Sequence, residues 1–243
     1  MGIDVTESSG DSLMGKGAIL RWIENKALAR HLRGKGVEIG ALWRKFPAPS
    51  KAIVWYVDRS DSIKLQREYP QLNNLIRPDV VADAGQLPFA DGSLNFVIAS
   101  HVLEHIPFPL AALRNWYAVL SSGGVLILRI PDKRYTFDVK RARTSLRHLI
   151  EEDLDPEAFD RRAHFEDWVQ HVGGREPGSK VLQDESDHLI GVDYSIHYHV
   201  WTDKDIHELV RHTQTSMGMK WRLVLFLSAH FYRKECALAL RRD

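Results

Sequence analysis

The chain has 243 residues, 44% of them hydrophobic, which is enough for one α/β domain with an insertion and a substantial core. Its 33 basic and 32 acidic residues leave a net charge of +1, which argues against general binding to nucleic acid or to an anionic membrane surface. The single cysteine, Cys236, cannot form an internal disulfide and is expected to be buried. With no apolar run long enough for a membrane helix, these features predict a cytoplasmic protein.

The first half of the chain alternates between strand and helix patterns. Residues 1–17 are rich in glycine and serine and predict a mobile arm. Apolar residues between Ile19 and Leu32 recur at helical spacing and predict an amphipathic helix. Short β-branched runs then predict strands over residues 37–39, 52–57, 79–82, 94–99 and 125–129. This alternation indicates a parallel sheet covered by helices on both faces.

The second half predicts an insertion and a return to the sheet. Pro109 suits the first turn of a helix over residues 109–120, which we expect Gly123 and Gly124 to close. Two charged helical segments, 139–152 and 156–172, predict a helical insertion that forms a lid over the substrate. Thr202 suits the cap of a helix over residues 202–216. Strand patterns over residues 221–227 and 230–240 then predict a hairpin that turns at Ser228.

The predicted fold class is therefore α/β, with a Rossmann-like, mostly parallel sheet of seven strands closed by a C-terminal antiparallel hairpin. The domain limits that follow are an arm (residues 1–17), a ligand-binding core (18–130), a helical insertion (131–201) and a C-terminal helix and hairpin that complete the sheet (202–243).

Polar or small residues follow each of the first four strands, at the sheet edge where open α/β sheets bind ligands. Gly40 allows backbone to approach a ligand closely. Asp58 follows about 20 residues later, the spacing at which a carboxylate meets a ribose diol. Asp83 and Ala84 end the third strand, where a carboxylate can accept from an adenine amino group. His101 ends the fourth strand and is expected to face the reacting centre.

The segment from about Gly36 to Arg129 resembles the class I methyltransferases that use S-adenosylmethionine (SAM), in particular those whose fourth strand ends in a His-x-x-Glu-His run, here His101 to His105. The resemblance implies an enzyme that transfers a methyl group and has SAM as its cofactor. We expect the cofactor to be bound by Glu38, Gly40, Ala41, Asp58, Arg59, Asp83, Ala84, Ser100 and His101. Glu38 has two predicted roles, orienting the loop after Gly40 or reaching the ammonium group of the cofactor through water.

Two departures from common patterns narrow the function. The usual Gly-x-Gly turn is reduced to Gly40-Ala41-Leu42, and Pro47 and Pro49 prevent a regular helix after it. A nicotinamide dehydrogenase needs that turn to bind a pyrophosphate, so this class is disfavoured. The Asn/Asp-Pro-Pro-Tyr run is replaced by Ser100-His101-Val102, which makes methylation of a nucleobase amino group less favoured.

The runs 129–153 and 193–202, with EIGALW and YVDRSD, resemble an uncharacterised group of bacterial methyltransferases found beside glycosyltransferases in polysaccharide gene clusters. This resemblance implies a sugar or glycan hydroxyl as methyl acceptor and raises a glycosyltransferase as a possible partner protein.

Candidate catalytic residues lie at the insertion. Asp132 follows the fifth strand, and Arg134, Tyr135 and Asp138 are expected to hold the acceptor; helix or loop capping is the alternative for Asp132 and Asp138. His101, His197 and His199 are candidates for the base that removes the hydroxyl proton.

Other roles remain open for these histidines. His197 and His199 alternate in sequence, so ligation of a metal with Asp132 and simple packing are further alternatives. We assign no metal site, and we interpret His164 and His171 as solvated or packed.

The leading hypothesis is a SAM-dependent O-methyltransferase acting on a small polar acceptor. An N- or C-methyltransferase of a small metabolite is the main enzymatic alternative. A non-catalytic protein of the same fold that assists a glycosyltransferase is a second alternative. An RNA methyltransferase is less favoured, because it would carry an appended basic, aromatic-rich module, whereas Arg141, Arg143 and Arg147 are interleaved with ordinary helix residues.

Overall fold

The computed structural model describes residues 16–232 and 234–243. The strands there are β1 (Gly34–Ile39), β2 (Ala52–Asp58), β3 (Val80–Val81), β4 (Leu94–Ser100), β5 (Leu120–Pro131), β6 (Trp221–Leu227) and β7 (Glu235–Arg242). The α-helices are α1 (Lys16–Ala29), α2 (Ser62–Glu68), α3 (Pro109–Val119), α4 (Leu146–Leu154), α5 (Arg161–His171), α6 (Lys180–Gly191), α7 (Asp203–Thr215) and α8 (Ala229–Tyr232). Short 3-10 turns are η1 (Leu103–His105), η2 (Lys133–Tyr135), η3 (Phe137–Lys140) and η4 (Pro156–Ala158).

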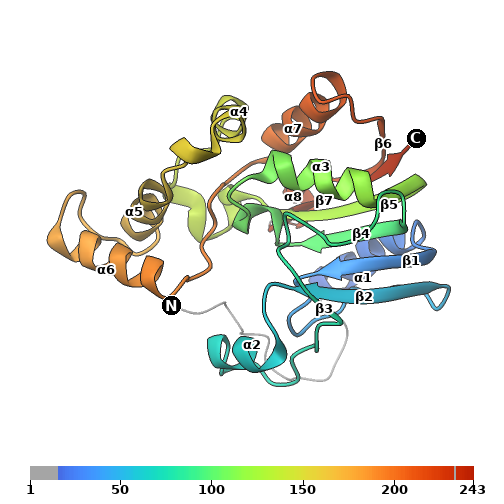
Figure 1. The fold of residues 1–243 in the computed structure, drawn as a ribbon, viewed down its shortest axis with the longest axis horizontal. Helices are drawn as coiled ribbons and strands as arrows, with labels where there is room; N and C mark the ends of the chain where they lie inside the picture. The colour runs from blue at the N-terminus through green and yellow to red at the C-terminus, as the bar shows by residue number, and fades with distance from the viewer. Residues whose placement is uncertain (1–15, 233) are drawn as a thin grey trace.

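The strands form one seven-stranded sheet in the order β3-β2-β1-β4-β5-β7-β6 (Figure 1). Strands β1 to β5 pair in parallel, whereas β7 is antiparallel to both β5 and β6. The predicted fold class is confirmed. Because β3, β2, β1 and β4 are neighbours and run the same way, their carboxyl ends meet at one edge of the sheet.

Two apolar layers cover the two faces of the sheet. On one face, α3 and α7 pack their buried side chains against alternate residues of the strands, with Trp116 of α3 fully buried among them. On the other face, α1 and the turn after it place Leu28 and Leu32 against Phe96 and Ile98 of β4. Residues 97 and 96 of β4 thus belong to opposite layers, as the two-residue repeat of a strand requires.

Local signals in the sequence account for two helix starts. Pro109 lies in the first turn of α3, and Thr202 caps α7 in a capping box with Asp205. The prediction for the end of α3 was wrong. The helix stops at Val119, and Gly123 and Gly124 lie inside the long strand β5, where Gly123 has a φ of +75° that favours glycine.

The predicted C-terminal hairpin is present but is not joined by a tight turn. The short helix α8 stands between β6 and β7, so the second strand begins at Glu235 and not near residue 230. Cys236 is buried in β7, as expected. Residues 1–15 of the predicted N-terminal arm lie outside the described residues, and α1 begins at Lys16.

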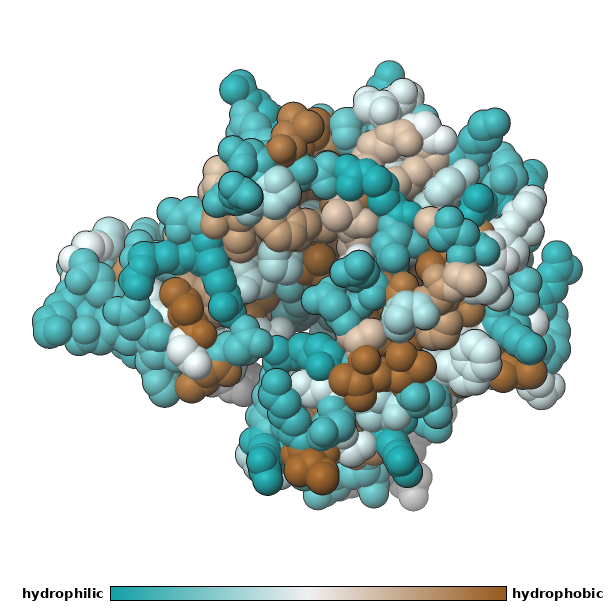
Figure 2. Space-filling model, in the orientation of Figure 1, coloured by the Kyte–Doolittle hydropathy of each residue, from teal (hydrophilic) through white to brown (hydrophobic). Residues whose placement is uncertain are grey.

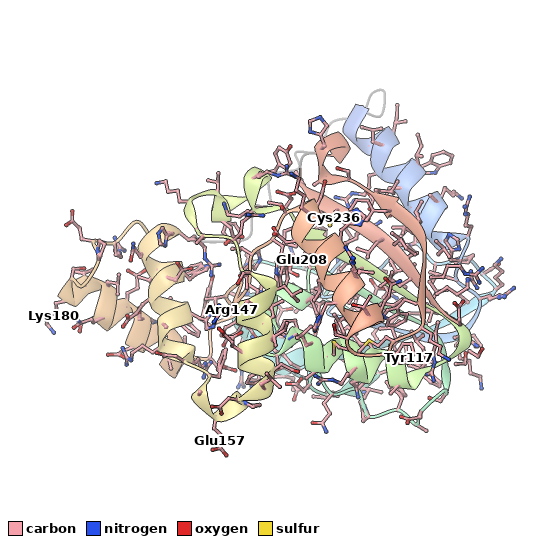
Figure 3. All side chains as sticks on the ribbon, turned by 90° about the horizontal axis from the view of Figure 1, so that it is seen from above. Tyr117, Arg147, Glu157, Lys180, Glu208 and Cys236 are labelled. Atoms are coloured by element: carbon pink, nitrogen blue, oxygen red, sulfur yellow. The ribbon has the colours of Figure 1, made fainter. Side chains whose placement is uncertain are left out.

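The insertion between β5 and α7 has three α-helices, one more than we predicted, because α6 follows α4 and α5. It has its own small core, in which Phe165, Ile196 and Tyr198 are buried. The lobe made by α4, α5 and α6 projects to one side of the sheet (Figure 1). Viewed from above, Lys180 of α6 lies at one end of the molecule, and Tyr117 of α3 lies in the opposite half (Figure 3).

No helix within the described ranges combines the length and the apolar character needed to cross a lipid bilayer.

The close approach of β1 and β4 gives a test of the sheet register. A Cβ atom at Gly36 would lie 2.4 Å from the carbonyl oxygen of Phe96, which is backbone and cannot rotate away. We expect Gly36→Ala to lower the free energy of unfolding by about 3 kcal/mol or more, measured by urea unfolding. Gly191→Ala is the matched control, because a Cβ at Gly191 meets nothing within 4 Å. Equal stability of the two variants would contradict the register.

Candidate functional site

The loop after β1 is shaped by two residues in the left-handed backbone region. Gly40 has a φ of +64°, and Leu42, unusually for a side chain of this size, has a φ of +50°. A Cβ on Gly40 would lie 3.1 Å from the side chain of Val102, which follows β4. Glycine at this position therefore serves the left-handed backbone and close packing against Val102, and contact of its backbone with a ligand stays a prediction.

Glu38 holds this loop in place from within. Its side chain is buried, and both carboxylate oxygens accept from the backbone N–H of Phe46, at 2.8 and 3.0 Å. Burial raises the pKa of Glu38 to about 7, against the opposing effect of these hydrogen bonds. Of the two roles predicted for Glu38, orienting the loop is the one that these contacts support.

Asp58 and Arg59 follow β2. Asp58 is half-buried, and burial raises the pKa of its carboxyl group against hydrogen bonds from the backbone of Arg59 and Ser60. The Arg59 side chain forms ion pairs with Glu68 of α2 and, at 3.3 Å, with Asp193 of the insertion. Arg59 therefore links the core to the end of the insertion, a contact that sequence spacing could not predict.

Asp83 and Ala84 follow β3. The carboxylate of Asp83 is exposed and accepts from the backbone N–H of Gly85 at 2.6 Å, which forms a tight turn. The carbonyl oxygen of Ala84 accepts from the indole N–H of Trp116 at 2.7 Å. A turn former and a ligand are compatible roles here, because the second carboxylate oxygen of Asp83 is still available.

Ser100 and His101 end β4. His101 has a φ of +55°, a strained conformation of the kind that clusters at functional sites. Its Nε2 is hydrogen-bonded to Glu235 of β7, and its Nδ1 lies 3.5 Å from Glu104. Burial lowers the pKa of His101, but the hydrogen bond and charge of Glu235 outweigh this and raise it. The hydroxyl of Ser100 is buried without a partner among the described residues.

A network of buried ion pairs holds the side chain that binds His101. Glu235 forms ion pairs with Arg21 of α1 and, at 3.8 Å, with Arg129 of β5. Arg129 in turn donates to Glu24 at 2.7 Å. Burial raises the pKa of Glu235, but His101 and the two arginines outweigh this and lower it to about 2. Glu235 therefore stays ionised, and His101 is held in place.

Glu104 connects His101 to the insertion. Its side chain has no exposed surface, and neither carboxylate oxygen has a hydrogen-bond partner among the described residues. One ligand-type atom from each of Glu104, His105 and His197 lies within 4.8 Å of the others. The predicted catalytic candidates His101 and His197 are far apart in the sequence, but both lie close to the buried carboxylate of Glu104.

Asp138 is paired with His197. The two side chains are hydrogen-bonded through Nδ1 at 2.7 Å, and Arg141 donates to Asp138 at 3.0 Å and to the carbonyl oxygen of His197 at 2.7 Å. Burial alone would raise the pKa of Asp138, but His197 and Arg141 outweigh it and lower the pKa. The alternative in which Asp138 caps the next helix is wrong, because Ser145 caps α4 and Thr136 caps η3.

Asp132 and Arg134 form their own pair. Asp132 is buried, caps η2 and accepts from the Arg134 side chain at 2.9 and 2.6 Å, so the capping alternative for Asp132 is confirmed. It also accepts from the backbone N–H of Asp203. Arg134 remains 45% exposed beside Tyr135, with its guanidinium 5.4 Å from that ring, so both remain candidates for holding an acceptor.

The structure separates His199 from His197. His199 has no exposed surface, donates through Nε2 to the carbonyl oxygen of Pro107 at 3.0 Å, and packs with His148 and His164. Alternation along the chain therefore does not bring His197 and His199 to a shared metal with Asp132.

The comparisons with known proteins agree with this geometry. Residues 33–128 match a protein family described as a methyltransferase domain. The matched segment spans β1 to β4 and most of β5, the strands whose carboxyl ends carry the predicted cofactor residues. The carboxylates of Asp58 and Asp83, at adjoining strand ends, fit the S-adenosylmethionine predicted from the sequence.

A 76-residue segment is 34% identical to the ubiquinone/menaquinone biosynthesis C-methyltransferase UbiE of Neisseria gonorrhoeae, and this match covers 31% of each chain. The chain therefore aligns with about a third of the length of that curated relative.

Two solved structures share the fold over most of the chain. A protein from Rhodobacter sphaeroides, described as a candidate Zn-dependent alcohol dehydrogenase, has a TM-score of 0.55 at 17% identity and covers 91% of this chain and 90% of its own. A possible exported protein from Bordetella parapertussis has a TM-score of 0.50 at 12% identity and covers 98% and 77%. At these identities, the similarity shows the fold alone.

Asp58 gives a test of the cofactor site. We expect Asp58→Ala to weaken binding of S-adenosylhomocysteine by about 10- to 100-fold, the range for a lost hydrogen bond to a charged group, measured by calorimetry. Asp91→Ala is the matched control, because Asp91 is exposed and lies before β4, away from this edge. Equal affinity of the two variants would remove Asp58 from the ribose site.

The raised pKa of Glu38 can be tested through the pH dependence of protein stability. Its pKa is about 7 when folded and about 4.5 when unfolded, so the folded state binds more protons between these values. Its contribution to stability is present below the unfolded pKa and is lost as pH rises through 7. We expect the free energy of unfolding to fall by about 3 kcal/mol from this group between about pH 4.5 and 8. The Glu38→Gln variant should lack this pH-dependent loss of stability in urea unfolding. Parallel pH profiles of the free energy of unfolding in wild type and variant would contradict the raised pKa of Glu38.

Proposed function

We propose that the protein transfers a methyl group from S-adenosylmethionine to a hydroxyl group of a small polar acceptor, such as a sugar or glycan. The observation that carries the proposal is the buried pair of His197 and Asp138, joined at 2.7 Å beside Glu104 and His105 of the run that follows β4.

The pair has the arrangement of a general base and the group that orients it. Asp138 binds Nδ1 of His197, so the proton of a neutral imidazole belongs on Nδ1 and the lone pair belongs on Nε2. Arg141 fixes both partners, since it binds the Asp138 carboxylate and the backbone carbonyl of His197. Such a histidine can take the proton of an acceptor hydroxyl as the new bond to carbon forms.

A hydroxyl acceptor suits this arrangement best. When bound, the cofactor supplies an electrophilic methyl group on a sulfonium. An alcohol oxygen must lose its proton in the transfer, which a neutral imidazole can accept near pH 7, whereas a free amine attacks without prior loss of a proton. The unpartnered oxygens of Glu104 support a polyhydroxylated acceptor, because a buried carboxylate without hydrogen bonds needs a polar ligand, water or an ion.

Further acceptor contacts are proposed from the insertion and its neighbours. Arg134 and Tyr135 on η2 offer a partly exposed guanidinium and ring, groups that hold hydroxyls and sugar faces. His101, held by Glu235, is proposed to face the reacting centre from the core side. The glycosyltransferase partner belongs to the same proposal and is supported by the resemblance of residues 129–153 and 193–202 to methyltransferases found beside such enzymes.

A C-methyltransferase is the second candidate, and the match to UbiE favours it. The 34% identity extends over only 76 residues, 31% of the chain, so it bears less on the acceptor than the His197 pair does.

The test is methyl transfer from SAM labelled in its methyl group to a panel of monosaccharides and nucleoside diphosphate sugars. We expect an O-methyl product by mass spectrometry and NMR. His197→Asn should lower kcat by about 10²- to 10⁴-fold, the usual contribution of a general base, and leave the affinity for S-adenosylhomocysteine unchanged.

His188→Asn is the matched control, because His188 is exposed on α6. Asp138→Asn should lower kcat and change its pH profile, since it removes the orienting charge. Transfer at the wild-type rate in His197→Asn would overturn the proposal.

A further inference from the structure

Three histidines and one glutamate meet beside the segment that carries His197, in a group separate from Glu104, His105 and His197. His148 and Glu152 come from α4, His164 from α5, and His199 from the segment that leads into α7. One ligand-type atom of each histidine lies within 4.8 Å of the others. Sequence spacing gave no sign of this cluster, because its members come from three separate segments.

Glu152 stands at the centre of the cluster. Its Oε1 lies 3.0 Å from Nε2 of His148 and 2.7 Å from Nε2 of His164, and its Oε2 lies 3.7 Å from Nε2 of His199. Four ligands around a tetrahedral zinc ion at bond lengths of about 2.0–2.1 Å lie about 3.3 Å apart. The separations from Glu152 to His148 and His164 are somewhat shorter than that value, so small outward shifts of these side chains would make room for an ion.

Two histidines of the cluster use one ring nitrogen for a hydrogen bond to a backbone carbonyl, as metal-binding histidines commonly do. Nδ1 of His164 lies 3.1 Å from the carbonyl oxygen of Tyr198, and Nε2 of His199 lies 3.0 Å from that of Pro107. A histidine bound to metal commonly donates its second ring N–H to such a carbonyl, which fixes the ring. These carbonyls leave Nε2 of His164 and Nδ1 of His199 as the electron-pair donors.

Two buried atoms of the cluster lack hydrogen-bond partners. Nδ1 of His199 and Oε2 of Glu152 are both unsatisfied among the described residues, and the His199 side chain has no exposed surface. Buried polar atoms rarely remain without partners in proteins. Both are good ligands for a borderline cation, so one ion would satisfy them together.

A route for a cation leads to the cluster from solvent. A cavity of about 240 Å³ is lined by His148, Glu152 and His164 together with Glu151, Asp155 and Asp160. The acidic residues at its mouth attract a cation, and the His148 side chain is 45% exposed there. Arg147, the neighbour of His148, projects from α4 (Figure 3).

We propose that His148, His164, His199 and Glu152 bind a structural Zn²⁺ ion that fastens α4 and α5 to the segment carrying His197. Imidazole nitrogens with one carboxylate in a tetrahedral set favour zinc, and four protein ligands leave no open position, as in structural sites. The ion would fix the insertion two residues from the base of the acceptor site and take no part in methyl transfer. The inference does not depend on the proposed function.

The test uses the full chain, washed with chelator and titrated with ZnCl₂ by calorimetry, with bound metal counted by mass spectrometry. We expect one Zn²⁺ per chain and a Tm higher with zinc than with chelator. Co²⁺ bound in its place should give the visible absorption of a tetrahedral site. His148→Asn and Glu152→Gln should each weaken zinc binding at least tenfold, while the control His188→Asn keeps wild-type affinity.

Glu104, His105 and His197 form a second group with ligand-type atoms within 4.8 Å, so His197→Asn distinguishes the two places. Zinc binding that persists in His197→Asn and is lost in His148→Asn and Glu152→Gln supports the proposal. The proposal is overturned if wild-type protein binds no stoichiometric zinc, if the two cluster variants bind it normally, or if only His197→Asn abolishes it. If wild-type protein binds no stoichiometric zinc, the cluster is a hydrogen-bonded network centred on Glu152.

Discussion

The buried carboxylate of Glu235 is the constraint on which the site depends. It lies at the start of β7 and is ion-paired with Arg21 of α1, with Arg129 of β5 and with His101 after β4. A buried charge is tolerated only when it is paired, and removal of one partner from such a group typically costs about 3–5 kcal/mol. These ion pairs hold the antiparallel end of the sheet and the first helix together with His101, the residue predicted to face the reacting centre. The strained backbone of His101 persists because these contacts over-determine it.

The insertion carries the residues proposed to bind and deprotonate the methyl acceptor. Its exposed face is largely hydrophilic, and the outline of the molecule is indented between the insertion and the part that carries α2 (Figure 2). Arg59 pairs with Asp193, which follows α6 and is close in sequence to His197. Arg141 fixes His197 and Asp138 through hydrogen bonds to both. The carboxyl edge of the sheet therefore carries the residues predicted to bind the cofactor, and the insertion carries the groups proposed to act on the acceptor.

Local and periodic signals predicted most of the fold. Strand runs, Pro109 and Thr202 identified elements correctly because these depend on nearby residues. The sequence could not show that Glu235 would meet His101, 134 positions earlier, since that contact depends on the antiparallel return of β7. For the same reason His197 and His199, two residues apart, were grouped together although the structure directs them to different clusters. Glu104 lay within a recognised motif, but its burial without a partner is visible only in three dimensions.

The most direct test of the proposed methyl-transfer site is a crystal structure of the protein with S-adenosylhomocysteine bound. We predict that the ribose lies against Asp58, that the adenine lies by Asp83 and Ala84, and that the sulfur atom faces the space between His101 and His197. A ligand bound elsewhere, or a sulfur atom pointing away from His197, would contradict the claim that the sheet edge and the insertion form one methyl-transfer site.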